Sequence, residues 1–182
     1  PPRSPLFPYT PLCRSSIAKT PLATVKEYAN SRNTEWASAS LRTYVNGTVK
    51  NLIPSTVRSA IKTVTKYTCG YLEYATPDAA RNKTSSDDVW IPSNREVTGD
   101  TNQETHGPTY SGAFTDDASR VRRLQGSGSP TSWWLRTSML WNGNYGARCV
   151  QNDGVVRYLE IERNEGGTWV KNYSAVVIGF CI

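Results

Sequence analysis

The chain has 182 residues, of which 37% are hydrophobic, and it carries a formal net charge of +6. This length suits one domain with room for a tail. The 6 Trp and 10 Tyr enlarge the modest core that so few aliphatic residues can build, because each ring buries a large area. No stretch approaches the ~18 consecutive apolar residues that a membrane span requires, so we expect no membrane insertion.

The basic residues are dispersed along the chain, and their densest cluster is Arg120, Arg122 and Arg123. Nucleic-acid-binding domains usually concentrate Lys and Arg in one stripe or on one face. We therefore expect no nucleic-acid partner. An acidic glycan or an anionic neighbouring protein could use the same positive charge.

The four cysteines, Cys13, Cys69, Cys149 and Cys181, include no Cys-x-x-Cys pair, and His106 is the single histidine. This pattern argues against a zinc cluster, and we expect no metal and no cofactor. We interpret the cysteines as buried free thiols. Cys181 in particular lies in an apolar stretch, where a thiol behaves as a small hydrophobe. A sparse disulfide framework is the alternative.

Six prolines within residues 1–24 predict extended, irregular chain, because proline fixes φ and lacks a backbone donor. We interpret residues 1–24 as a linker or as an arm that lies on a neighbouring molecule, and a disordered tail is the alternative. Residues 25–182 would form one domain. The chain begins with Pro1 rather than Met, which indicates a fragment or a processed product.

The middle of the chain predicts two packing helices and several short elements. Residues 38–46 place Leu41, Tyr44 and Val45 on one helical face, with Ser38 as the cap and Gly47 as the stop. Residues 55–64 repeat apolar side chains at i, i+3, i+4 and i+7. The further expected elements are strands over 63–68 and 89–91, a capping box over 93–96, a loop over 98–112 and a short helix over 116–124.

The last third of the chain predicts strands. Trp133 to Arg136 should be a strand with at least one of its two tryptophans in the core, since both can be buried only if the sheet is covered on both faces. Arg136 should pair with a buried carboxylate. The turn signal at residues 151–154 predicts a hairpin between strands at 147–150 and 155–158. Residues 158–162 alternate in polarity, Gly166-Gly167 is a turn, and residues 176–182 predict a final strand. Helices first and short strands later indicate an α+β fold.

These elements resemble a bacterial and phage domain family of unknown function, common in Firmicutes and their prophages. The resemblance covers about residues 25 to 182. The residues that carry it are Trp36, Leu41, Arg42 and Asn46-Gly47; Val89-Trp90-Ile91-Pro92-Ser93 and Glu96; Glu104, Gly107-Pro108 and Tyr110; Trp133-Trp134-Leu135-Arg136-Thr137; Asn152-Asp153-Gly154; and Gly179-Phe180-Cys181-Ile182.

The family looks like a C-type-lectin-like fold, of the variant also found in formylglycine-generating enzymes and phage receptor-binding proteins. In that fold two helices and a small twisted antiparallel sheet support long loops that bind ligands. The opening strands of that fold are not evident in residues 1–24, which departs from the pattern.

The sequence supports an enzymatic function less well than a recognition function. An oxidase of the formylglycine-generating type would need a close reactive cysteine pair, for which Cys149 and Cys181 are the candidates. A hydrolase would need two carboxylates in one cleft, and the adjacent pairs at 87–88 and 116–117 are better explained as turn and helix-start residues. The chain has no Glu-Pro-Asn or Gln-Pro-Asp triplet for calcium-dependent sugar binding. We therefore expect no enzyme activity.

The candidate ligand surface is the polar-aromatic tract at residues 139–145 and 158–173. Tyr, Trp, Asn and Gly give contact area at low entropic cost. The ligand-binding residues that we expect are Trp141, Asn142, Asn144, Tyr145, Tyr158, Arg163, Asn164, Trp169, Asn172 and Tyr173.

The sequence thus predicts a recognition domain of a phage tail or head appendage, or of a bacterial surface protein. Its partners would be a host cell-surface receptor or glycan and other virion or surface-protein subunits, in a homo-oligomer. It would lie on the virion or the bacterial surface. The alternative is a structural protein that decorates a virion and docks on other virion proteins.

Overall fold

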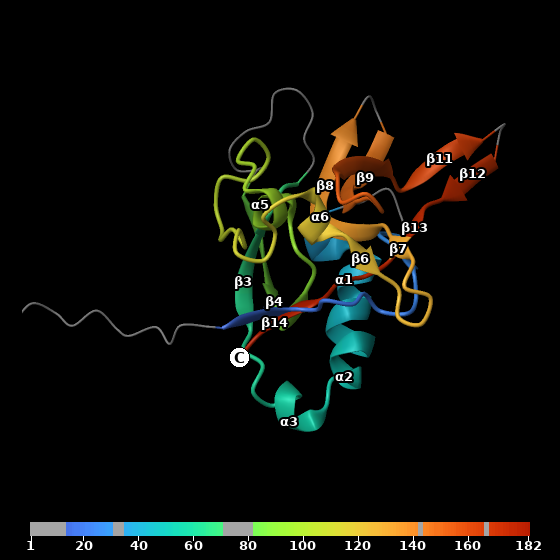
Figure 1. The fold of residues 1–182 in the computed structure, drawn as a ribbon. Helices are drawn as coiled ribbons and strands as arrows, with labels where there is room; N and C mark the ends of the chain where they lie inside the picture. Colours follow the sequence, from blue (N-terminus) through green and yellow to red (C-terminus); the bar gives the residue numbers. More distant parts are fainter. Residues whose placement is uncertain (1–13, 31–34, 71–81, 142–143, 166–167) are drawn as a thin grey trace, which may run out of the picture.

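The computed structural model describes residues 14–30, 35–70, 82–141, 144–165 and 168–182. They form short helical segments and small antiparallel ladders, which confirms a mixed α+β architecture (Figure 1). The helical segments are η1 (Trp36–Ser38), α1 (Ser40–Tyr44), the π-helical turn η2 (Val45–Val49), α2 (Lys50–Leu52), α3 (Ser55–Arg58), α5 (Asn94–Thr98) and α6 (Asp117–Arg120). The strands are β1 (Ser15–Ile17), β2 (Lys26–Glu27), β3 (Val64–Thr68), β4 (Lys83–Asp87), β5 (Val89–Trp90), β6 (Arg122–Arg123), β7 (Pro130–Thr131), β8 (Trp133–Trp141), β9 (Asn144–Val150), β10 (Val156–Glu160), β11 (Glu162–Glu165), β12 (Thr168–Lys171), β13 (Tyr173–Ser174) and β14 (Gly179–Cys181).

Two three-stranded sheets organise these elements. One has the order β10-β9-β8, and the other has the order β1-β14-β5. In the second sheet the start of the described chain pairs with its end, because Ser15 lies opposite Cys181 and Ser16 opposite Phe180. The boundary expected at residue 24 therefore does not mark the start of the fold, and residues 15–17 form a strand rather than irregular chain.

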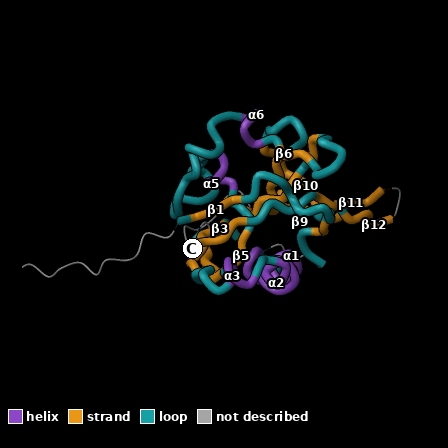
Figure 2. Tube along the Cα trace, turned by 60° about the horizontal axis from the view of Figure 1, so that its bottom comes forward, coloured by secondary structure: helices purple, strands orange, loops and turns teal. Residues whose placement is uncertain are grey.

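The strand β8 runs between two apolar clusters. Trp134 packs with Tyr28 and Trp36 on one side, and Trp133 packs with Phe114 on the other. Successive side chains of a strand point to opposite faces, so both tryptophans can be buried only because both faces are covered. Both are fully buried, where the sequence predicted burial of at least one. Figure 2 shows the helical segments α1 to α3 on one side of the molecule and α6 with β6 on the other.

The helical predictions were right in place and wrong in extent. Gly47 does not stop the first helix, which continues through η2 into α2. The buried Val45 and Val49 prolong its apolar face, and their packing outweighs the ~1 kcal/mol that a helical glycine costs. Ser38 does not cap the helix either, since it lies in η1 and Ala39 is the cap residue.

The second expected helix is much shorter than residues 55–64. It ends at Arg58, and the backbone N–H of Lys62 donates to the carbonyl of Cys181 instead of continuing the helix. The predicted short helix at 116–124 likewise forms only over Asp117–Arg120. The final strand is Gly179–Cys181 rather than residues 176–182.

Several local signals were confirmed. Ser93 and Glu96 form the reciprocal capping box of α5, and Asp116 caps α6. The strand expected at 63–68 is β3, and the turn at Gln151–Gly154 joins β9 to β10. Gly154 adopts φ 88°, a left-handed conformation that glycine reaches without strain.

The cysteine prediction holds for two residues and fails for a third. Cys69 and Cys149 are buried free thiols. Cys181 is disulfide-bonded, which corrects its interpretation as a buried free thiol. An apolar sequence context therefore did not distinguish a packed thiol from a cross-linked one.

Candidate functional site

Most of the predicted ligand surface maps to two hairpins, while Tyr158 lies on β10, Tyr173 on β13, and Asn172 between β12 and β13. The strands β8 and β9 form the first, and β11 and β12 form the second, which projects from the body of the molecule (Figures 1 and 2). In the described backbone Trp141 lies opposite Asn144. Arg163 lies opposite Val170, and Asn164 opposite Trp169. Asn142 lies outside the described residues.

Backbone hydrogen bonds fasten the base of the second hairpin to the first. The N–H of Ile161 donates to the carbonyl of Tyr145 over 3.0 Å, and the N–H of Asn172 donates to the carbonyl of Ile161 over 2.9 Å. Ile161 itself is buried in the core. The two parts of the predicted surface are therefore joined through one core residue.

Glu160 accepts hydrogen bonds from two of the predicted residues, and a third predicted residue bonds to one of these two. The side-chain amide of Asn144 donates to its carboxylate over 3.1 Å, and that of Asn172 donates to its backbone carbonyl over 2.6 Å. The hydroxyl of Tyr158 donates to the carbonyl of Asn144 over 2.7 Å. Burial and the Glu160 charge raise the pKa of Tyr158, so its hydroxyl stays a donor at neutral pH.

Sequence reasoning did not single out Glu160. The alternating pattern over 158–162 could have indicated it, because residues two apart on a strand share a face. The structure therefore brings Asn144, Tyr158 and Asn172 together near Glu160, whose carboxylate accepts from Asn144 and whose backbone carbonyl accepts from Asn172. Tyr145 is partly buried beside them.

Tyr173 is the most exposed of the predicted aromatic residues whose side chains the structure describes, with 56% of its surface accessible. It lies opposite Glu27 in the ladder of β13 and β2. Glu27 also binds Lys171, with 2.8 Å between Oε2 and Nζ. The end of the second hairpin is thus anchored by an ion pair next to an exposed ring.

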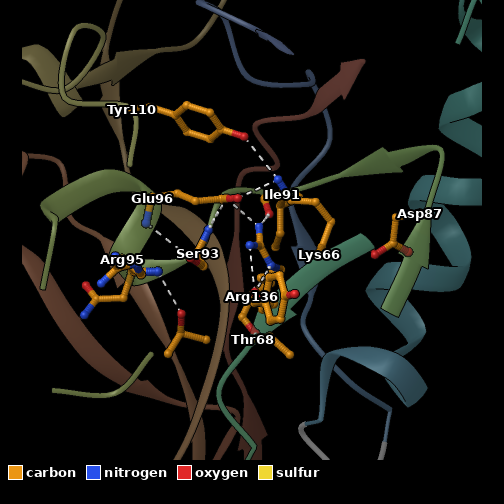
Figure 3. A network of polar contacts seen from close by, with 12 residues as sticks. Lys66, Thr68, Asp87, Ile91, Ser93, Arg95, Glu96, Tyr110 and Arg136 are labelled. Atoms are coloured by element: carbon orange, nitrogen blue, oxygen red, sulfur yellow. Dashed lines mark hydrogen bonds and ion pairs between the residues drawn. The ribbon is translucent and has the colours of Figure 1, made fainter. Parts of the chain in front are cut away.

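Beneath these strands, Arg136 of β8 forms the centre of a buried ionic network (Figure 3). Its Nη1 lies 2.6 Å from Oε2 of Glu96 and donates to the carbonyl of Ile91 over 2.7 Å. Its Nε and Nη2 both donate to the carbonyl of Tyr67. The expected pairing of Arg136 with a buried carboxylate is confirmed.

Lys66 of β3 completes the network. Its Nζ lies 2.5 Å from Oε1 of Glu96, 3.1 Å from the hydroxyl of Tyr110 and 3.6 Å from the centre of the Trp90 ring. Burial, followed by the charge of Arg136, lowers the pKa of Lys66 to about 8. Burial opposes the ionised form of Glu96, but Arg136 and Lys66 outweigh it and hold the pKa of that carboxyl below its usual value.

A lysine with a perturbed pKa can mark an active site. Lys66, however, is only 5% exposed, and its ammonium is enclosed by Glu96, Tyr110 and Trp90. A reacting group would have to displace one of these neighbours. The arrangement supports a structural role, in which the network ties β3, α5 and β8 together.

The residue after Arg136 fastens a second carboxylate. The hydroxyl of Thr137 donates to Oε1 of Glu104 over 2.6 Å, and the other oxygen of Glu104 accepts from the backbone N–H of Arg95. Glu104 is 1% exposed. Neighbouring residues of β8 thus hold α5 and the loop that follows it from two directions.

Asp87 forms a third polar centre, between the helical segment and β4. Its carboxylate accepts from Trp36 Nε1, Arg42 Nε, Asn46 Nδ2 and the Ser85 hydroxyl. The prediction of a turn role for Asp87 was wrong, because it is fully buried at the end of β4.

The cysteines expected for an oxidase do not form a reactive pair. Burial raises the pKa of the Cys149 thiol to about 11, and Cys181 is already disulfide-bonded. Among the described residues, no group of three or more His, Cys, Asp or Glu is placed to hold a metal ion. No helix in the described ranges is long and apolar enough to cross a membrane.

The model of one protein family matches the chain over residues 12–171, and that family is described as a domain of unknown function (DUF6273). The expected membership of a domain family of unknown function is therefore confirmed. The match carries no information on the lectin-like fold. Neither the curated proteins nor the solved structures contain a significant match to the chain.

Proposed function

The chain belongs to the DUF6273 family, and we propose that it is a non-enzymatic recognition domain that binds a cell-surface receptor, either a glycan or a protein. The binding surface comprises residues 139–145 and 158–173. The domain would belong to a phage tail or head appendage, or to a bacterial surface protein.

The arrangement around Glu160 is the observation that carries this proposal. It fixes Asn144, Tyr158 and Asn172, which come from three separate segments, in one place on the molecule. Binding sites gain affinity when their polar groups are held in position before the ligand arrives. Tyr173 adds an exposed ring that can stack on a sugar or a protein side chain.

We propose further that the fold is C-type-lectin-like, as the sequence resemblance implies. The short helical segments, the antiparallel ladders and the long connection between α5 and α6 support this assignment. The strand β1 also supplies an opening strand that was not evident in the sequence. An experimental structure compared with lectin-like domains would test this assignment.

The disulfide at Cys181 supports a location on a virion or cell surface. Disulfides persist in oxidising surroundings and are rare in reducing cytosol. The same reasoning applies to a phage appendage and to a bacterial surface protein, so it does not separate the two.

The test is binding of the purified chain to intact cells of candidate Firmicute hosts. The principal variant is Trp141→Ala with Trp169→Ala, which removes one large ring from each hairpin. The matched control is Leu52→Ala, which removes an apolar side chain that is 73% exposed on α2, away from both hairpins (Figure 1).

Loss of cell binding in the double variant, with binding kept by Leu52→Ala, would support the proposal. Both variants must show wild-type thermal unfolding, because a misfolded chain would also fail to bind. Wild-type binding that survives in the double variant would contradict the assignment of the surface.

One observation favours the second candidate, a structural or decoration protein. An apolar hollow of about 360 Å³ lies between α2, α3 and β14, and Leu52 borders it. Its lining residues are Leu22, Val49, Leu52, Ile53, Pro54, Val57, Ile178 and Phe180. An exposed apolar hollow suits docking on another subunit of an assembly.

If the wild type binds no host cell but associates with a virion subunit, and Leu52→Ala weakens that association, the structural function is favoured.

A further inference from the structure

A second hollow lies beside the proposed receptor-binding surface, between β2 and α1. Its volume is about 190 Å³, and it is lined by Lys26, Glu27, Ser40, Leu41 and Tyr44. Sites for drug-sized ligands usually measure ~300–1,000 Å³, so this one has room for a single compact group. It adjoins the receptor-binding surface because Glu27, on its wall, lies opposite the exposed Tyr173.

The charges of this hollow are unbalanced. The carboxylate of Glu27 is engaged by Lys171, with 2.8 Å between the charged atoms. Within the described part of the chain, Lys26 forms no ion pair, and its ammonium lies 4.5 Å from the centre of the Tyr44 ring. The Glu27 carboxylate is thus already paired, whereas no described carboxylate neutralises the charge of Lys26, which is left for a ligand to neutralise.

Two serine hydroxyls at or beside the hollow lack a hydrogen-bond partner within the described residues. Ser40 lines the hollow, and its buried Oγ is one of the two. The Ser174 Oγ is also buried without a hydrogen-bond partner in the described part of the chain, and Ser174 lies directly opposite Lys26 in the ladder of β13 and β2. Directly opposed residues of a ladder share a face. A buried hydroxyl without a partner is unfavourable, which a ligand oxygen would correct at Ser40.

From these observations we propose that the hollow binds a compact anionic group, the carboxylate or phosphate of a surface glycan, with Lys26 as its cation and Ser40 as a hydrogen-bond donor. The cation–π contact with Tyr44 holds the ammonium in place without neutralising it. This inference rests on the proposed receptor-binding function, because it names the chemistry that the adjoining site would take.

The test uses the full chain labelled with ¹⁵N and three small probes. Methyl glucuronide carries a carboxylate, and glycerol phosphate carries a phosphate. Methyl glucoside is the uncharged counterpart of methyl glucuronide and serves as the control probe. We expect at least one anionic probe to shift the amide signals of residues 26, 27 and 40–44, and the neutral probe to leave them unchanged. The stronger anion identifies the source of the charge.

Two lysine variants make the test specific. Lys26→Met keeps the aliphatic stem and removes the charge, and it should weaken the anionic probe about tenfold, as expected for loss of a charge-assisted hydrogen bond. Lys62→Met removes an exposed lysine between α3 and β3 and should change nothing. Ser40→Ala is a second variant that should also weaken binding, and it replaces Lys26→Met if that chain does not fold.

Equal binding of the glucuronide and the glucoside would overturn the proposal. So would unchanged affinity in Lys26→Met, or the absence of shifts at these residues with both anions. Wild-type chain that binds host cells but no anionic probe would refute this inference and leave the receptor-binding function standing. The opposite result would refute receptor binding and leave the anion site standing.

Discussion

Arg136 and Glu96 form an ion pair whose charged atoms are 2.6 Å apart and whose side chains are each 1% exposed. Lys66 shares the same carboxylate from the other side, with 2.5 Å between Nζ and Oε1. Ions that are taken out of water need such partners, because a lone buried charge is strongly unfavourable. The pair therefore makes the contact of β8 with α5 dependent on both residues.

Glu96→Gln should strongly destabilise the fold. The substitution leaves Arg136 and Lys66 without their shared anion in a buried place, and losses of one partner from such pairs cost about 3–5 kcal/mol. The free energy of unfolding from urea titration is the measurement. Asp153→Asn removes a partner from the exposed pair with Arg157 and serves as the control, with little expected change in the free energy of unfolding, because solvent screens an exposed pair. Equal losses in the two variants would contradict the role assigned to the network.

Stability should rise as the pH increases from 8 to 9. The pKa of Lys66 is about 8 in the folded chain and 10.5 in the unfolded reference. Between these values the unfolded state binds more protons, so deprotonation favours the folded state. The raised pKa values of Cys149, about 11, and Tyr110, about 12, act in the opposite direction, and these effects begin near pH 9 and pH 10, the ordinary values of the two groups. Urea titrations at several pH values should show this slope in the wild type and lose it in Lys66→Met. A stability that falls throughout this range would count against the burial of a charged lysine.

Gly154→Ala should be costly for two reasons. A Cβ atom there would lie 1.8 Å from the carbonyl oxygen of Asp117, and the residue has φ 88°. Gly126 has φ 94° but no atom within 4 Å of a Cβ, so Gly126→Ala isolates the backbone strain. We expect about 1–2 kcal/mol for Gly126→Ala and a clearly larger loss for Gly154→Ala. Similar losses would mean that the contact with Asp117 relaxes easily. Thermal unfolding of the two variants is the comparison.

Glu160→Ala should weaken receptor binding more than it weakens the fold. Its carboxylate is partly exposed and accepts from Asn144, so its removal frees that side chain without leaving a buried charge unpaired. We expect several-fold weaker cell binding and a stability change of ~1 kcal/mol or less. A large stability loss would instead identify Glu160 as a core support. Cell binding and urea titration on the same preparation separate these outcomes.

Alkylation should distinguish the three cysteines that the structure describes. Treatment of the unfolded, unreduced chain with iodoacetamide should label Cys69 and Cys149 but not Cys181. In the folded chain Cys149 should resist labelling, because its thiol is buried and its pKa is raised to about 11. Peptide mass spectrometry reads both results. Labelling of Cys181 without prior reduction would refute the disulfide.

The sequence predicted the features that depend on neighbouring residues. The apolar pair at 133–134 identified the buried strand, the spacing of Ser93 and Glu96 identified the start of α5, and Gln151–Gly154 identified a hairpin. Each of these signals lies within a few residues of the element it forms. The ligand surface was also predicted from neighbouring residues, since it is a tract of polar and aromatic side chains. Two members of this tract, Asn144 and Asn172, hydrogen-bond to Glu160.

Asp87 shows what could not be predicted. Its partners Trp36, Arg42 and Asn46 lie 51, 45 and 41 residues earlier in the chain. No periodicity or spacing records such pairing, because it depends on how the helical segment packs against β4. The unbroken passage of the helix through Gly47 has the same origin, since the burial of Val45 and Val49 decided it.

The antiparallel pairing of β1 with β14 affects how the molecule responds to force. The backbone groups of Arg14 and Ile182 bond to each other, so the two ends of the described fold emerge side by side. Because Cys181 of β14 is also disulfide-bonded, hydrogen bonds alone do not decide how this ladder opens under force. A domain that is pulled by one end would pass the load to both strands through the ladder between them.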